Sequence, residues 1–114
     1  MKPLKTIEII EDDEIYVYLT EKTIMKANIA EQIQVFNNGL DAINFLKENK
    51  ENLVLMPEII LLDLSMPIMD GWQFLEEFVL LSPKIGREIV IYIVSSSISP
   101  DDIKRAAKID AVSD

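Results

Sequence analysis

The stretch that decides the fold is IILLDLSMPIMDGWQF, residues 59–74. Four apolar residues, Ile59–Leu62, run directly into a single acid, Asp63, and Pro67 and an Asp-Gly pair follow. A short apolar run without polar alternation is typical of a strand that is buried on both faces. Pro and Asp-Gly are typical of a loop. The stretch therefore predicts a buried strand that ends in a carboxylate, followed by a tightly shaped loop.

Similar apolar runs recur along the chain and alternate with helical patterns. We expect strands at 4–10, 33–36, 58–62 and 88–94, and helices at 14–26, at 40–50, after Gly71 and from Ser99-Pro100 onward. This β-α order with apolar strands predicts a parallel sheet covered by helices. The alternative, an α+β fold with an antiparallel sheet, would show alternation along the strands. Only Glu8 hints at that, and we interpret it as lying near a strand end or facing a thin part of the helical cover.

Composition excludes several kinds of site. The 114 residues suit one domain, and 49% of them are apolar, which permits a real core. The chain has no cysteine and no histidine, so disulfides, thiolate metal sites and histidine chemistry are excluded. Eleven basic against twenty acidic residues give a net charge of −9, which disfavours nucleic acid as a partner. No apolar run approaches the roughly 18 residues of a membrane span and no signal peptide is visible, so we expect a cytoplasmic protein without membrane association.

Polar groups follow three of the four expected strands. Glu11 and Asp12 follow the first strand, Asp63 the third, and a serine run that begins with Ser95 the fourth. Each feature alone has an ordinary explanation as a helix cap, a turn or a loop. In open parallel sheets, however, ligands bind beyond the carboxyl ends of the strands. If these strands are neighbours, their oxygen groups meet at one edge of the sheet.

The available groups restrict the chemistry of such a site. Neighbouring carboxylates repel one another at neutral pH, and a hard divalent cation such as Mg²⁺ removes that cost. A carboxylate can act as a nucleophile and form an aspartyl phosphate. Mg²⁺ would then neutralise charge on the transferred phosphoryl group, and the Ser95 hydroxyl could donate a hydrogen bond to it.

Together these residues resemble the receiver domain of two-component response regulators, of the chemotaxis-regulator type. The resemblance covers nearly the whole chain. It is carried by four stretches: IIEDDE (9–14), NNGLDAINFL (37–46), LLDLSMPIMDGWQFL (61–75) and IVSSSISPDD (93–102). It implies a flavodoxin-like, doubly wound parallel sheet of strand order 2-1-3-4-(5).

The resemblance also implies roles for individual residues. It makes Asp63 the phosphoacceptor and makes Glu11 and Asp12 the acidic pair that, with Asp63, holds Mg²⁺ or Mn²⁺. The main-chain carbonyl of Ser65 would be a further metal ligand. Ser95 and Ser96 would contact the phosphoryl group. Pro67 and Gly71 would shape the loop, and Asp13 would start a helix.

The sequence departs from the family pattern at its C-terminal end. The fifth strand, its phosphate-contacting lysine and the fifth helix are expected to be missing, so we interpret 1–114 as a single, C-terminally incomplete receiver domain with no output domain visible. The strand at 88–94 would then be an exposed edge, which predicts self-association. The segment 47–58 is longer than usual for the family and predicts a long loop.

The function implied by the resemblance is phosphorelay signal transduction, not enzymatic turnover. A sensor histidine kinase or a histidine phosphotransfer protein would phosphorylate Asp63 and so switch a surface that binds a downstream partner. One alternative is a receiver-like docking module that is never phosphorylated. Another is a Mg²⁺-dependent aspartyl phosphatase, but that class needs an acid two residues after the nucleophile, where this chain has Ser65.

Overall fold

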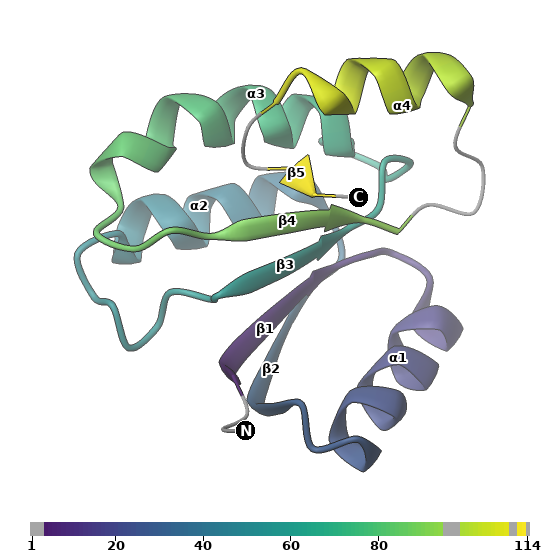
Figure 1. Ribbon diagram of the computed structural model, residues 1–114, viewed down its shortest axis with the longest axis vertical. Coiled ribbons are helices and arrows are strands. Elements are labelled where there is room, and N and C mark those ends of the chain that lie inside the picture. Colours follow the sequence, from purple (N-terminus) through teal and green to yellow (C-terminus); the bar gives the residue numbers. More distant parts are fainter. Residues whose placement is uncertain (1–3, 95–98, 110–111, 114) are drawn as a thin grey trace.

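The computed structural model describes residues 4–94, 99–109 and 112–113, and it shows one parallel sheet between helices (Figure 1). The strands are β1 (Leu4–Ile10), β2 (Ala30–Phe36), β3 (Ile59–Leu62), β4 (Val90–Ile93) and β5 (Val112–Ser113). The helices are α1 (Glu14–Lys26), α2 (Gly39–Asn49), α3 (Gly71–Leu81) and α4 (Pro100–Ala107), with a 3₁₀ turn at Ser82–Lys84. The order across the sheet is β2-β1-β3-β4-β5, and every pairing is parallel. The doubly wound prediction is confirmed, and the antiparallel alternative is wrong.

The two faces of the sheet carry separate apolar clusters. On one face α1 packs against β1 through Ile24, Ile7 and Ile9. On the other face α2 and α3 cover a larger core, built from the side chains Ile10, Ala42, Ile43, Leu46, Met56, Ile60, Leu62, Phe74, Leu75, Phe78, Leu81, Ile85, Ile89 and Ile91. On the α1 face the cover is partial, since Ile59 and Leu61 of β3 and Val90 and Tyr92 of β4 are half-buried. Both faces carry mainly apolar side chains, so the polar groups collect at the strand ends.

Three sequence expectations need correction. β2 begins at Ala30, earlier than the expected start at residue 33. Val112–Ser113 pairs with Ile91 and Tyr92 of β4, so a two-residue fifth strand occupies the place that we expected to be missing. Glu8 lies in the middle of β1 and is fully buried, so neither explanation for it was right.

The new pairing changes the basis of one prediction. Where it pairs with β5, the edge of β4 is covered by main-chain hydrogen bonding. Self-association through this edge stays a prediction, with a smaller exposed edge than expected. The part of the chain that the structure describes contains no fifth helix, and none of its helices is long and apolar enough to cross a membrane.

The helices begin where local caps direct them. Asp13 accepts hydrogen bonds from the N–H groups of Ile15 and Tyr16, which confirms it as the residue that starts α1. Ser99 caps α4 in a reciprocal capping box with Asp102, and Pro100 takes the first helical position. The long segment after α2 is a loop, as predicted, and it ends at β3.

Gly71 permits a close approach between α3 and the end of β3. A Cβ atom at this position would lie 2.6 Å from the main-chain oxygen of Asp63 and 2.8 Å from Cα of Leu64. The Gly71 N–H donates to the Leu64 carbonyl at 3.1 Å. The start of α3 is therefore pressed against the backbone that carries Asp63, and only glycine fits there.

Replacing Gly71 with alanine should destabilise the protein by about 1–3 kcal/mol, because backbone atoms must shift to admit the methyl group. The matched control is Gly86→Ala, where the added Cβ would meet only the flexible tip of the Leu53 side chain at 3.2 Å. Chemical denaturation of both variants measures the difference. Equal free energies of unfolding for the two variants would contradict this account of Gly71.

Arg105 attaches α4 to α3. Its guanidinium carbon lies 4.2 Å from the centre of the Trp72 ring, and Nη2 lies 3.8 Å from Oε1 of Glu76. None of the residues of α4 is buried. The stacked Arg105 side chain is thus a principal contact that holds α4 in place.

Arg105→Ala should shift the fluorescence emission of Trp72 to longer wavelength, because the ring loses its cover. Trp72 is the only tryptophan in the chain, so the signal is unambiguous. The loss of stability should be small, about 0.5–1 kcal/mol, as expected for an exposed cation–π contact. Lys104→Ala removes the same charge from the same helix and serves as the control; an equal shift in that variant would argue against the stacking contact.

Candidate functional site

The site is built by main-chain hydrogen bonds at the ends of three neighbouring strands. The N–H of Asp63 donates to the carbonyl of Ile10 at 3.0 Å, and the N–H of Glu11 donates to the carbonyl of Phe36 at 2.9 Å. These bonds extend the pairings of β1 with β3 and with β2 by one residue each. As a result the residues that follow β1 and β3 lie side by side at the carboxyl edge of the sheet.

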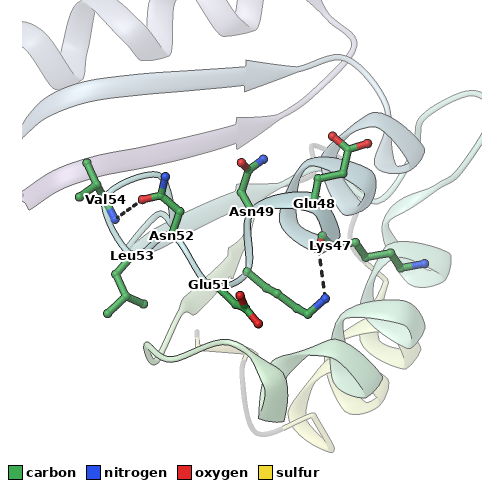
Figure 2. Close-up of a pocket in the computed structure, with 8 residues that line it drawn as sticks. Lys47, Glu48, Asn49, Glu51, Asn52, Leu53 and Val54 are labelled. Atoms are coloured by element: carbon green, nitrogen blue, oxygen red, sulfur yellow. Dashed lines mark hydrogen bonds between the residues drawn. The ribbon is translucent and has the colours of Figure 1, made fainter.

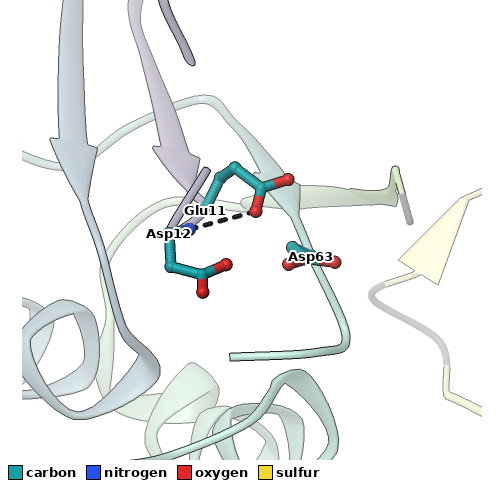
Figure 3. Close-up of side chains that lie close together, drawn as sticks. All are labelled: Glu11, Asp12 and Asp63. Atoms are coloured by element: carbon teal, nitrogen blue, oxygen red, sulfur yellow. Dashed lines mark hydrogen bonds between the residues drawn. The ribbon is translucent and has the colours of Figure 1, made fainter. Parts of the chain in front are cut away.

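Three carboxylates converge at this edge (Figure 3). Glu11, Asp12 and Asp63 can each supply a carboxylate oxygen such that the three oxygens lie within 4.8 Å of one another. Glu11 and Asp63 are each only 7% exposed, whereas Asp12 is exposed to solvent. The structure therefore brings together the three acids that the sequence analysis singled out.

The electrostatic cost of this arrangement appears at Glu11. Burial raises its pKa to about 8, and the hydrogen bonding and negative charge of neighbouring Asp63 add to the rise. Two main-chain N–H groups oppose it only in part: those of Asp12 and Asp13 donate to Oε2 of Glu11 at 3.0 and 3.3 Å. Without a cation, Glu11 keeps a proton at neutral pH.

The donor set fits a hard divalent cation. Three carboxylate oxygens, two of them from buried residues, are the ligands that Mg²⁺ and Mn²⁺ prefer, and the chain has no histidine or cysteine to add a nitrogen or sulfur ligand. A cation at this place would take over the role of the proton on Glu11. The arrangement can thus hold a cation directly against one carboxylate, that of Asp63.

The loop after Asp63 is held in a strained shape. The N–H of Ser65 donates to Oδ1 of Asp63 at 3.3 Å, and the N–H of Met69 donates to the carbonyl of Pro67 at 2.7 Å in a three-residue turn. The central residue of this turn, Ile68, has a φ of 69°, in the left-handed region that a β-branched residue rarely adopts. Such strain costs about 1–3 kcal/mol and is characteristic of functional loops.

Two features of the site's support were missed by the sequence analysis. Asn38 is buried and caps α2 by accepting the N–H of Asp41 at 2.8 Å, and the N–H of Gly39 donates to the carbonyl of Met69 at 3.0 Å. The start of α2 therefore supports the loop behind Asp63. The pair Asn38–Asp41 is a recognisable capping pattern that could have been found. The contact with Met69 joins distant segments and has no local signal.

Not all expected site residues can be placed. Ser95 and Ser96, the expected phosphoryl-contacting residues, lie outside the described residues. Ser65 lies two residues after Asp63, as required, but a role of its carbonyl as a metal ligand stays a prediction. Pro67 and Gly71 shape the loop in the way described above.

Apart from these carboxylates, a concave region lies at the end of α2 (Figure 2). It is lined by Lys47–Val54. Several of its polar groups have nearby partners: Oδ1 of Asn52 accepts the N–H of Val54 at 3.2 Å, Nζ of Lys50 lies 3.5 Å from the carbonyl of Lys47, and Nζ of Lys47 lies 3.7 Å from Oε1 of Glu77. The hollow is a surface formed by a loop and contains no cluster of reactive groups.

Comparisons with known proteins point to one family. The sequence model described as "Response regulator receiver domain" matches residues 7–113. A probable methanogenesis regulatory protein, FilR2 of Methanothrix harundinacea, is 26% identical over 100 residues, and the response regulator Rcp1 of Synechocystis is 29% identical over 102 residues. These matches cover 88% and 89% of this chain and 63% and 68% of the two relatives, so the chain spans about two thirds of their length.

Solved structures agree with the sequence matches. The crystal structure of a two-component response regulator from Cytophaga hutchinsonii superposes with a TM-score of 0.88 at 29% identity, over 97% of this chain and 83% of that one. A structure of the Mn²⁺-bound form of Rcp1 superposes with a TM-score of 0.79 at 26% identity, over 92% and 75%. Both the sheet order and the family match lead to the same conclusion. The chain belongs to the response regulator receiver domain family of two-component signalling.

Proposed function

We propose that this chain is a cytoplasmic phosphorylation switch in which Asp63 accepts a phosphoryl group from a histidine kinase or a histidine phosphotransfer protein. The observation that carries the proposal is the convergence of Glu11, Asp12 and Asp63 within 4.8 Å at the ligand edge of the sheet. A structural role alone would not require three acids there, because mutual repulsion destabilises them.

The proposed reaction is a transfer between two side chains. One oxygen of the Asp63 carboxylate forms a bond to phosphorus while the bond between phosphorus and the donor's histidine nitrogen breaks, and the proton needed by the departing imidazole comes from solvent. Glu11 and Asp12, with Asp63 and the Ser65 carbonyl, would hold Mg²⁺ or Mn²⁺. When bound, the cation neutralises charge on the phosphoryl oxygens.

The proposed output is a change in binding of a downstream protein, not turnover. Ser95 and Ser96 would contact the phosphoryl group. The surface of α4, which follows them in the chain, would change as a result. Phosphorylation would thereby bias an equilibrium between two states. A hydrolytic alternative lacks its general acid, since Ser65 stands at that position and its N–H is bonded to Asp63. A docking module that is never phosphorylated would have no need for the strained loop and the acid cluster.

Incubation with a small phosphodonor and Mg²⁺ should add one phosphoryl mass to the protein, measured by intact mass spectrometry. Asp63→Asn should add none, since an amide oxygen is a poor nucleophile. Asp70→Asn, which retains a capping residue at the start of α3, is the control and should be phosphorylated like the wild type. Absence of added mass on the wild type would defeat the switch and favour the docking module.

Asp12→Asn should weaken Mg²⁺ binding at least tenfold, because a neutral amide replaces a charged ligand. The adjacent Asp13→Asn is a matched control. Asp13 caps α1 and is not among the three clustered acids, and asparagine caps helices equally well. Isothermal titration with Mg²⁺ compares the two variants. Equal losses would mean that only net charge matters and that the three acids do not form a defined site.

A further inference from the structure

The middle of β1 contains an acid that the proposed function does not use. The side chain of Glu8 is 0% exposed, and neither of its oxygens has a hydrogen-bond partner among the described residues. Such a group is costly, because a carboxyl removed from water must find a partner or give up its charge. Its presence in the centre of a core strand therefore requires an explanation.

A second unpartnered atom lies on the neighbouring strand. Glu8 and Gln34 are paired residues in the parallel register of β1 and β2, so their side chains project from the same face of the sheet. Nε2 of Gln34 donates to the carbonyl of Leu55 at 3.3 Å, whereas its Oε1 is buried without a partner. A carboxyl with no acceptor and an amide oxygen with no donor thus belong to paired positions on adjacent strands and to the same face of the sheet.

We propose that Glu8 is held as a neutral carboxylic acid that donates a hydrogen bond to Oε1 of Gln34, and that this pair gives the domain a stability that falls as the pH rises from acidic to mildly alkaline values. A protonated carboxyl is a donor, so one proton satisfies both orphaned groups. Together with the bond from Gln34 to Leu55, it forms a chain of hydrogen bonds from β1 through β2 to the long loop before β3.

The surroundings of Glu8 favour the neutral form. β3 contributes Ile60 to its face, and the buried side chains of α2 on this side of the sheet are apolar. The charged groups on adjoining segments are occupied elsewhere: Oε1 of Glu58 accepts the Lys5 N–H, and Nη1 of Arg87 donates to the carbonyl of Met56. Burial alone raises the pKa of Glu8 to about 8, without a contribution from any charge.

An ionised alternative would need the Gln34 amide turned around. Nε2 would then face a Glu8 carboxylate, but Oε1 would face the Leu55 carbonyl, so two acceptors would meet and a donor would be lost. The charge would also remain without a cation in the core. The neutral pair satisfies more groups at less cost.

The dependence on pH has a definite sign. A carboxyl in the unfolded chain titrates near 4.5, and the folded protein holds the Glu8 proton up to about 8. Between these values the folded state binds the extra proton, so its stability falls as pH rises. The stabilisation is complete below 4.5 and is lost by the time the pH has passed about 8.

The direct test is a titration of the Glu8 carboxyl by NMR on the whole chain with ¹³C-labelled glutamate. Saturating Mg²⁺ is added to remove the proton from Glu11, and the Glu8 signal is identified by its absence in Glu8→Gln. We expect a midpoint near 8. A midpoint below about 6, close to that of an ordinary glutamate, would overturn the proposal.

The second test compares the stability of wild type and Glu8→Gln across pH. The glutamine amide can donate to Gln34 at every pH, so the variant should gain stability relative to wild type as pH rises from 5 to 9. Taking the difference cancels all other titrating groups, including Glu11. A difference that stays constant over this range would overturn the proposal. If Glu8→Gln fails to fold, Gln34→Leu, which removes the acceptor that stabilises the protonated form, should lower the midpoint of Glu8; an unchanged or raised midpoint contradicts the pair. Neither test depends on phosphorylation of Asp63.

Discussion

The hydrogen bond from the N–H of Asp63 to the carbonyl of Ile10 is the constraint on which the site depends. It continues the register of β1 and β3 past their last paired residues, Ile10 and Leu62, and so sets Glu11 beside Asp63. The main chain is needed for this, because the two side chains repel each other whenever both are ionised. Packing of the apolar clusters on the two faces of the sheet supplies the free energy that holds the acids together. The clustered acids in turn favour the binding of a cation.

The loop behind Asp63 shows the same division of roles. Ile68 in this loop has a left-handed backbone conformation, which a β-branched residue would not adopt without support from the rest of the structure. The shape of the loop is imposed by α2, whose Gly39 N–H bonds to the Met69 carbonyl, and by α3, whose first residue Gly71 lies against the Asp63 backbone. The first residues of α2 and α3 therefore both contact this loop. A substitution that moves the start of either helix will move Asp63.

Much of the fold could be predicted from sequence, because most signals were local. The apolar run Ile59–Leu62 and the caps Asp13 and Ser99 each act within a few residues. The start of β2 was missed because this edge strand is largely exposed and its first residues, Ala-Glu-Gln, carry no apolar pattern. The fifth strand was missed because two residues form no periodicity, and their pairing with β4 is a long-range event. The convergence of the three acids followed from the topology, whereas Ser95 and Ser96 lie outside the described residues.

Glu8 could not have been placed from sequence, since its partner lies 26 positions away and is itself an unremarkable polar residue. Comparison with Glu11 shows why it matters. Both acids belong to one strand or its end, and both have a pKa raised to about 8, but the causes differ. The pKa of Glu11 is raised by burial and by Asp63, so a cation bound at the acid cluster can displace the Glu11 proton. The pKa of Glu8 is raised by burial alone, and Glu8 is not among the acids that would contact that cation. The pH dependence of the stability difference between wild type and Glu8→Gln, measured at saturating Mg²⁺, therefore reports the core of the sheet and not its ligand edge.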